Sequence, residues 1–204
     1  ELRAGRPVLL TAANGQARAV LALDSSTAQS YAAFARAAQG RHYLFVTPTR
    51  AQVLGLSAPQ GARVALVEHD YDQLAALAYL RDTPVPTQWT PGDALDAGAV
   101  EIARLGLLLP AMLAVELHGA DDHAAFAGCQ SLALDDLGSG CAKSAAAGYE
   151  LVTRTPVPLR GLGMSEFVVF RGGVAQRDQV AIVVGQPDLS VAVPVRVHSS
   201  CLTG

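Results

Sequence analysis

The sequence predicts an α+β protein built of mixed α/β layers, and three observations support this class. Half of the 204 residues are apolar, which is enough to bury a sizeable core. Strand-like and helix-like stretches alternate over roughly the first 150 residues, as they do in layered α/β architectures. Near Val152 the pattern changes to strand, turn, strand, with glycines and prolines between. We therefore expect one domain in residues 1–151 and the first strands of a second domain in residues 152–204.

Composition excludes several classes of partner. The net charge is −3 and only 16% of the residues are charged, so no basic field is available for nucleic acid or an anionic membrane surface. The longest apolar stretch, LGLLLPAMLAVEL, is interrupted by Pro110 and Glu116, and no signal-peptide pattern opens the sequence, so we expect no membrane association. Three widely spaced cysteines (Cys129, Cys141, Cys201) do not form a disulfide framework, and they favour a reducing, cytoplasmic location.

The first elements follow from turn and cap residues. Asn14-Gly15 separates GRPVLLTAA from ARAVLALD, which predicts a β-hairpin whose two turn residues both have positive φ. SSTAQSYAAFARAAQG begins with hydroxyl caps and ends at Gly40, which is typical of a helix. HYLFVTP is expected to be a buried strand and TRAQVLGL a short helix.

The next elements flank a proline-rich segment. Residues 82–93, DTPVPTQWTPGD, contain Pro84, Pro86 and Pro91 and predict an extended surface loop, in which Trp89 serves as a packing anchor. ALDAGAVEIARLGLLL has the period of an amphipathic helix, AMLAVEL predicts a strand, and ALDDLGSGCAKSAAAGYEL predicts a capped helix. Three strands are then expected, in TRTPVPLRGLGMSEFVVFR, QVAIVVGQPD and VAVPVRVHSS.

The last ten residues, VRVHSSCLTG, concentrate polar chemistry. On a strand, Arg196, His198 and Ser200 point to one face, where a cation, an imidazole and a hydroxyl could hold an anion. Cys201 follows and could offer a thiolate to zinc. The residues alone favour a plainer interpretation, an edge strand with solvated polar side chains and a buried thiol.

This stretch resembles the signature R-V-H-S-E-C-L-T-G-D of GTP cyclohydrolase II, an enzyme of riboflavin biosynthesis. VPLRGLGMSEFVVFR and QVAIVVGQPD resemble the first strands of that family's domain. The resemblance implies a hydrolase that opens the imidazole ring of GTP and releases formate and pyrophosphate. It also implies a bound Zn²⁺ and a homodimer, and Mg²⁺ could accompany the GTP. A zinc-bound water of lowered pKa suits attack on a purine carbon.

The resemblance also assigns roles to individual residues. Cys201 would be the first of three zinc ligands, while the other two cysteines and the catalytic residues are expected beyond residue 204. Ser200 stands where the family has glutamate. Two alternatives therefore stay open: an inactive paralogue that serves as a dimerisation or regulatory module, and a cyclohydrolase acting on another purine nucleotide. The residues that would line the nucleotide are Arg196, Val197, His198, Ser199 and Ser200.

The first domain resembles a second riboflavin enzyme, 3,4-dihydroxy-2-butanone 4-phosphate synthase. AGRPVLLT, ARAAQGRHYLFVTPTRAQVLGL and AVEIARLGLLLPAMLAVEL follow that family's order of strands and helices. The family holds magnesium with an acidic loop, but the matching stretch LTAANGQARAV has no carboxylate. The family's G-H-T-E-A motif becomes ALDAG, with Leu95 in place of the histidine, although Glu116 matches a later glutamate. We therefore interpret this domain as a degenerate, inactive synthase.

Two other polar stretches, EHDYD (68–72) and HGADDH (118–123), combine histidines with carboxylates and could bind a metal. We interpret both as solvated loops, because each follows a predicted strand in a polar, turn-like context.

Overall fold

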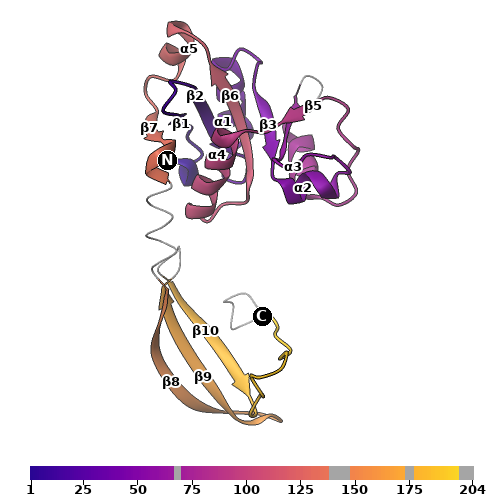
Figure 1. The fold of residues 1–204 in the computed structure, drawn as a ribbon, viewed down its shortest axis with the longest axis vertical. Helices are drawn as coiled ribbons and strands as arrows, with labels where there is room; N and C mark the ends of the chain where they lie inside the picture. The colour runs from indigo at the N-terminus through magenta and orange to yellow at the C-terminus, as the bar shows by residue number, and fades with distance from the viewer. Residues whose placement is uncertain (67–69, 138–147, 173–176, 198–204) are drawn as a thin grey trace. The chain divides into compact units, whose positions relative to one another are not determined.

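A computed structural model of the chain describes residues 1–66, 70–137, 148–172 and 177–197. The chain divides into two compact units, unit 1 (Glu1–Lys143) and unit 2 (Ser144–Gly204). Figure 1 shows the helices and one sheet in unit 1 and a separate sheet in unit 2. The predicted α+β class is confirmed.

Unit 1 contains a seven-stranded sheet of order β5-β4-β3-β6-β2-β1-β7. Neighbouring strands are antiparallel except β1 and β7, which are parallel. The strands are β1 (Val8–Thr11), β2 (Ala17–Ala22), β3 (Tyr43–Val46), β4 (Ala62–Ala65), β5 (Trp89–Pro91), β6 (Ala111–Leu117) and β7 (Gln130–Ala133). The helices are η1 (Leu2–Ala4), α1 (Ala28–Ala37), α2 (Pro48–Val53), α3 (Tyr71–Tyr79), α4 (Ala94–Leu105) and α5 (Ala120–Ala125).

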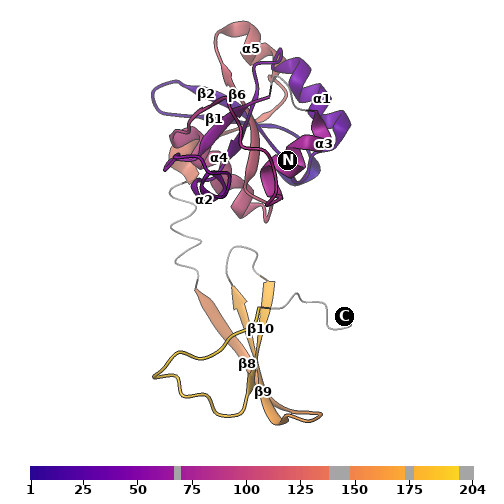
Figure 2. The same ribbon diagram turned by 90° about the vertical axis from the view of Figure 1, so that its right-hand side faces the viewer.

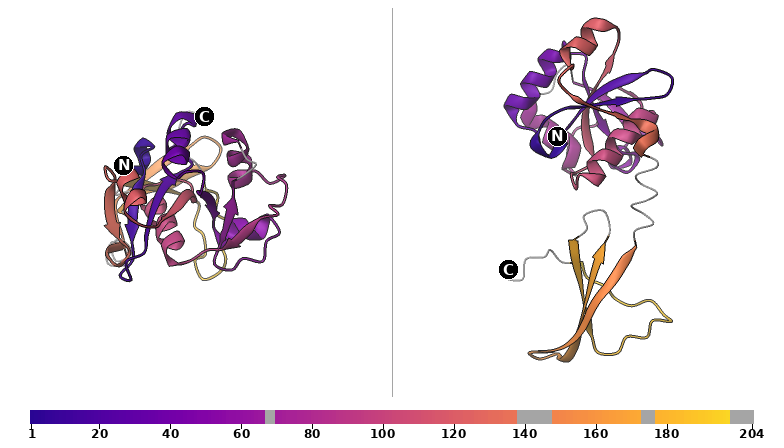
Figure 3. Two further views of the ribbon diagram at one scale, coloured as in Figure 1. Left: turned by 90° about the horizontal axis from the view of Figure 1, so that it is seen from above. Right: turned by 90° about the vertical axis from the view of Figure 1, so that its left-hand side faces the viewer.

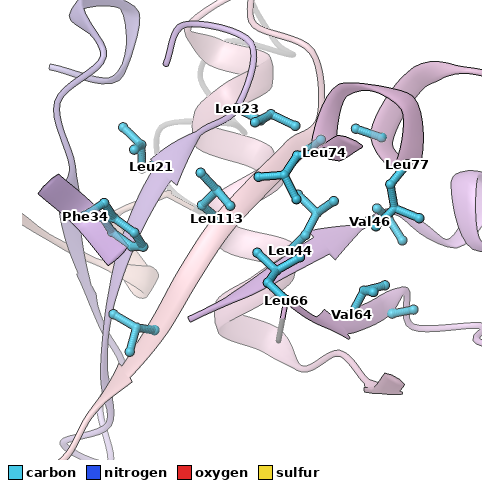
Figure 4. Packing of buried hydrophobic residues seen from close by; sticks show 14 of the residues in the cluster. Leu21, Leu23, Phe34, Leu44, Val46, Val64, Leu66, Leu74, Leu77 and Leu113 are labelled. Atoms are coloured by element: carbon cyan, nitrogen blue, oxygen red, sulfur yellow. The ribbon is translucent and has the colours of Figure 1, made fainter. Parts of the chain in front are cut away.

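Each face of this sheet has its own apolar core. One core joins strand residues such as Leu21, Leu44 and Leu113 to Phe34 of α1 and Leu74 of α3 (Figure 4). The second core, on the opposite face, includes buried residues of α4. Figure 2 shows α1 and α3 on one side of the sheet and α4 on the other. Because side chains alternate along a strand, β2, β3 and β6 each contribute buried residues to both cores.

Unit 2 contains an antiparallel sheet of order β10-β9-β8, seen as a twisted ribbon in the right-hand view of Figure 3. Its strands are β8 (Tyr149–Leu159), β9 (Gly163–Gly172) and β10 (Arg177–Val184). The register shifts between Leu151 and Thr153, a β-bulge or irregularity in β8. Val152, where the sequence predicted the domain boundary, lies within β8. The position of the boundary stays a prediction.

Most predicted elements are present, including the first hairpin, but its turn differs from the prediction. The amide of Gly15 donates to the carbonyl of Ala12, and the amide of Ala12 donates to that of Gln16. Gly15 has φ 85°, whereas Asn14 is not among the described residues with positive φ. The hairpin thus uses a longer loop in which one glycine supplies the left-handed residue, so the expectation for Asn14 was wrong.

Three further stretches differ from the sequence prediction. Residues 89–91 of the proposed loop form β5, which pairs with β4, while Trp89 packs against the first core as predicted. Asp70 begins helix α3 instead of lying in a loop, because it accepts a hydrogen bond from the amide of Gln73 as a helix cap. The described part of the stretch 191–200, residues 191–197, forms no strand. Pro194 cannot donate to a sheet ladder, and no strand of the described chain pairs with this segment.

The helix expected in ALDDLGSGCAKSAAAGYEL lies largely outside the described residues. The sequence showed no stretch able to cross a bilayer, and in the part of the chain that the structure describes, every helix is too short or too polar to do so.

Candidate functional site

The predicted nucleotide-binding segment is only partly described. Arg196 and Val197 lie in an irregular, exposed stretch, and the Val197 side chain is 99% exposed. The other predicted site residues, His198, Ser199, Ser200 and the zinc ligand Cys201, lie outside the described residues. Their convergence on one face therefore stays a prediction.

Metal-ligating side chains are dispersed in the described ranges. No group of three His, Cys, Asp or Glu side chains in these ranges could hold a metal ion. Cys129 is half-buried against the first core, and burial raises the pKa of its thiol. A thiol held in its neutral form is a poor metal ligand. Cys141 lies outside the described residues.

The most concentrated polar feature in the described part of unit 1 is a cluster of ion pairs, here called the charge cluster. Its members lie on the sheet face that α4 covers, and strand alternation explains how they meet there. In β2, Val20 and Ala22 belong to the second core, and Arg18 lies on the same face of the strand. In β6, Met112 and Ala114 belong to the second core, and Glu116 lies on their face. The members are Arg18, Tyr43, Arg63, Asp93, Asp96 and Glu116.

The N-terminus of α4 supplies two of the carboxylates. Asp93 caps the helix by accepting hydrogen bonds from the amides of Leu95 and Asp96, and Asp96 accepts one from the amide of Asp93. This reciprocal capping box fixes both carboxylates beside the sheet. Leu95, which aligns with the synthase histidine, is buried in the second core and cannot replace a ligand.

Arg18 is the most deeply buried cation of the charge cluster, with a side chain 2% exposed. Its Nη1 and Nη2 atoms donate to the two carboxylate oxygens of Asp93 at 2.7 and 2.9 Å. Nη1 also lies 2.8 Å from Oδ1 of Asp96, and Nη2 lies 2.9 Å from Oε1 of Glu116. Arg18 and Glu116 are register partners across β2 and β6, which places them directly opposite one another.

Arg63, from β4, contacts the same three carboxylates. Its Nε donates to Oδ2 of Asp96 at 2.5 Å, its Nη1 to Oε1 of Glu116 at 2.9 Å, and its Nη2 forms an ion pair with Asp93. The Tyr43 ring lies 5.2 Å from the guanidinium carbon of Arg63, within cation–π range. Each carboxylate of the charge cluster therefore contacts both arginines.

The electrostatics agree with this mutual pairing. Burial alone would lower the pKa of Arg18, but its hydrogen bond to Asp93 leaves that pKa raised. The pKa of Arg63 is raised as well, because hydrogen bonds to Asp96 and Asp93 outweigh its burial. Burial would raise the pKa of Asp93, yet the two arginines hold it well below its usual range. These three shifts favour the charged forms of Arg18, Arg63 and Asp93.

The OH of Tyr43 donates to Oδ1 of Asp96 at 2.7 Å. Burial, and then the charge of Asp96, raise the pKa of Tyr43, so the phenol stays protonated and serves as a donor.

A pocket of about 520 Å³ opens beside the charge cluster, and its wall includes Arg41, Arg63, Trp89, Glu116 and His118. Arg41 forms an ion pair with the buried Asp122, whose pKa this hydrogen bond lowers. The interpretation of residues 118–123 as a solvated loop is thus partly wrong, because Asp122 is buried in α5 and pairs with Arg41.

Sequence reasoning found Glu116 but missed the other members of the charge cluster. A signal was present, since Arg18 in ARAVLALD and Arg63 in ARVAL interrupt apolar strand patterns. A charged residue inside a buried strand requires a partner.

The charge cluster offers little for magnesium. The turn at residues 12–16 carries no carboxylate, and the carboxylates that remain are already bound by guanidinium groups. Magnesium needs several oxygen ligands that are free to face it, so the described residues of the charge cluster do not fit this ion.

Comparison with solved structures supports the fold. The chain is similar to a two-domain 3,4-dihydroxy-2-butanone 4-phosphate synthase from A. baumannii, with a TM-score of 0.52 and 19% identity over 90% of this chain and 68% of that one. A cation-free 3,4-dihydroxy-2-butanone 4-phosphate synthase matches with a TM-score of 0.51 and 18% identity over 71% of this chain and 94% of that one. The same coverage, with a TM-score of 0.50 and 17% identity, holds for a synthase in complex with two magnesium ions. The chain is therefore an α+β protein with a synthase-like fold.

Comparison with known sequences links the chain to a second family. Residues 150–204 match the family model of GTP cyclohydrolase II. The chain is 64% identical, over all 204 residues, to a GTP cyclohydrolase-2 of Xylella fastidiosa strain Temecula1, and 30% identical to one of Azospirillum brasilense. It covers 51% and 56% of those proteins, so it spans about half the length of the curated relatives it matches. These findings confirm the resemblance: the chain is similar in sequence to proteins named GTP cyclohydrolase-2.

Proposed function

We propose that the protein to which this chain belongs is a GTP cyclohydrolase II, which opens the imidazole ring of GTP by hydrolysis and releases formate and pyrophosphate. The observation that carries the proposal is the 64% identity, across the entire chain, to proteins named GTP cyclohydrolase-2. The family match over residues 150–204 supports it, since that segment contains the RVHSSCLTG string.

The proposal gives roles to the residues of that string. Arg196, Val197, His198, Ser199 and Ser200 line the nucleotide, and a guanidinium there would offset triphosphate charge. Cys201 is one sulfur ligand of zinc, a donor type that zinc prefers. When bound, zinc would supply Lewis acidity that makes water a better nucleophile at neutral pH. Mg²⁺ would enter only with the GTP.

We also propose a homodimer in the cytoplasm, with unit 1 inactive as a synthase. The cysteine count supports the location, because three unevenly spaced thiols suit a reducing compartment. The charge cluster supports the inactivity of unit 1, since each of its carboxylates contacts two arginines.

Zinc content and formate release of the full-length protein test the assignment. We expect Cys201→Ser to lower bound zinc severalfold and to reduce turnover by at least about 100-fold, because a thiolate ligand is lost. Cys129→Ser is the matched control, since Cys129 lies in unit 1 against the first core and should leave both quantities unchanged. Full turnover in Cys201→Ser would refute the role of this thiol.

Ser200 favours a second candidate, a cyclohydrolase that acts on a different purine nucleotide. A serine in place of glutamate leaves no carboxylate at this position to contact the nucleotide, so substrate choice could shift. Comparing kcat/KM for GTP, ITP and ATP decides between the two. A clear preference for GTP supports the main proposal, whereas faster turnover of another purine nucleotide supports the second. Absence of turnover with all three would instead indicate an inactive paralogue.

A further inference from the structure

The charge cluster occupies the place in unit 1 where the synthase resemblance puts a metal site. Leu95 stands at the position of the family's histidine, and it lies between Asp93 and Asp96 in sequence. Glu116 matches the family's later glutamate, and Arg18 closely follows the turn that lacks the acidic residues. One solved neighbour of similar fold is described as a complex with two magnesium ions. The cations found at this place in the present chain are arginines.

We infer that Arg18 and Arg63 take the place of divalent cations in unit 1. Their guanidinium groups pair with the carboxylates of Asp93, Asp96 and Glu116, so the charge cluster binds no Mg²⁺ and unit 1 needs none there to fold. The inference concerns the electrostatics of unit 1 and is independent of any cyclohydrolase activity in the complete protein.

The contacts show how completely the arginines fill this role. The Arg63 guanidinium reaches all three carboxylates, through Nε to Asp96, Nη1 to Glu116 and Nη2 to Asp93. Arg18 reaches the same three from the deeper side, with its side chain 2% exposed. Asp96 is fully buried, so it would be strongly disfavoured as an anion without a cation beside it.

Both oxygens of Asp93 and of Asp96 lie against a guanidinium, so a metal ion could reach them only by displacing an arginine. Glu116 offers Oε1 to both arginines, and its Oε2 lies 3.6 Å from Nε2 of His118. One such oxygen is too few to hold Mg²⁺.

Charge balance explains why two arginines are needed. By formal charge, three carboxylates face two guanidinium groups, which leaves one negative charge in excess. Loss of one arginine would leave three carboxylates with a single cation, in a partly buried place where repulsion is strong. A hydrated divalent cation would then be the natural replacement, since carboxylates are its preferred ligands.

The first experiment uses the full-length protein without nucleotide. We expect titration with MgCl₂ to give no saturable heat, and 10 mM MgCl₂ to leave the melting temperature within about 1 °C of its value in KCl of equal ionic strength. A saturable heat that disappears in Glu116→Gln would overturn the inference.

The second experiment removes one internal cation. We expect Arg63→Ala to lower the melting temperature by about 10 °C, because a buried ion pair loses one partner. We expect 10 mM MgCl₂ to restore about 3–5 °C in this variant and nothing in the wild type, by binding the released carboxylates of the folded state. Arg104→Ala is the matched control, since Arg104 pairs with Glu101 in an exposed pair and its loss should cost little.

The third variant separates charge from packing. Arg63→Ala combined with Glu116→Gln removes one charge of each sign, so it should melt above Arg63→Ala and lose the response to MgCl₂. If Arg63 served only to pack against Tyr43, the second substitution would bring no recovery. That result, or an Arg63→Ala variant that responds to MgCl₂ no more than the wild type, would contradict the inference.

Discussion

His42 is a buried histidine whose protonation the fold opposes. Its side chain lies against the rings of Tyr31 and Phe34, with ring centroids 5.4 and 6.1 Å away, and the residue is 8% exposed. Nε2 lies 3.1 Å from the Tyr31 hydroxyl, while Nδ1 is buried with no hydrogen-bond partner among the described residues. Burial therefore lowers the pKa of His42 below its ordinary value of 6.5.

This lowered pKa makes the stability of unit 1 depend on pH. As the pH falls through about 6.5, the unfolded chain gains a proton that folded His42 does not accept, so the free energy of unfolding decreases. The contribution is complete above the unfolded pKa and is lost below it, by at most about 1.4 kcal/mol per pH unit. Urea titrations between about pH 7.5 and 5.5 should show this slope, and His42→Phe should make it shallower.

His123→Asn controls for the loss of a histidine as such, because His123 is exposed in α5. Its slope should match that of the wild type. An unchanged slope in His42→Phe would show that another group accounts for the pH dependence.

The charge cluster shows where prediction from sequence stops at the level of single residues. Arg18 and Arg63 interrupt apolar strand patterns, so their burial and their need for partners could be foreseen. The partners could not be foreseen, because Arg18 and Asp93 are 75 positions apart and meet only through the sheet register and the packing of α4. In the terminal segment, Arg196 was predicted on a strand, but the described residues around it form none.

Among the elements, helices with clear caps were predicted well. Thr27 caps α1 and Thr47 caps α2, both with hydroxyl side chains that signal a helix start. Helix α3 was missed although Asp70 and Gln73 form a capping box, because the stretch was judged by its histidine and carboxylates. Strand β5 was missed because Pro91 argues against a strand; β5 lies at the sheet edge, where proline is tolerated.

Two glycines allow a test of how tightly the β3–β4 region is packed. Gly15 and Gly61 both have φ 85°. A Cβ at Gly15 would meet nothing within 4 Å, whereas one at Gly61 would clash with the Phe45 ring and lie 2.6 Å from the carbonyl oxygen of Val46. Alanine strains the backbone similarly at both positions, so the difference between the two variants reports packing alone.

We expect Gly15→Ala to lower the free energy of unfolding by about 1 kcal/mol, which is the cost of a left-handed alanine. Gly61→Ala should cost about 1–3 kcal/mol more, because Phe45 must move in a filled core. Urea unfolding followed by circular dichroism measures both, provided that the m-value is unchanged. Equal losses would mean that the β3–β4 region yields to the added methyl group without cost.

At the scale of the whole molecule, the two units differ in how much core they have. Unit 1 covers both faces of its sheet with helices and buries two apolar clusters. In the described part of unit 2, Val168 is the single apolar side chain that is fully buried, while Leu151, Met164 and Ile182 are 47%, 61% and 49% exposed. A three-stranded sheet with so little buried apolar surface is marginal in water.

We therefore expect residues 1–143, produced alone, to unfold cooperatively in urea and to give dispersed amide signals by NMR. Residues 144–204 alone should give neither, because chain entropy exceeds what this sheet buries. The full-length protein, with both regions present, is the reference for the spectrum of each piece. Dispersed amide signals and a cooperative transition from residues 144–204 would contradict this prediction. They would show that contacts between the three strands stabilise the sheet of unit 2 without a buried apolar core.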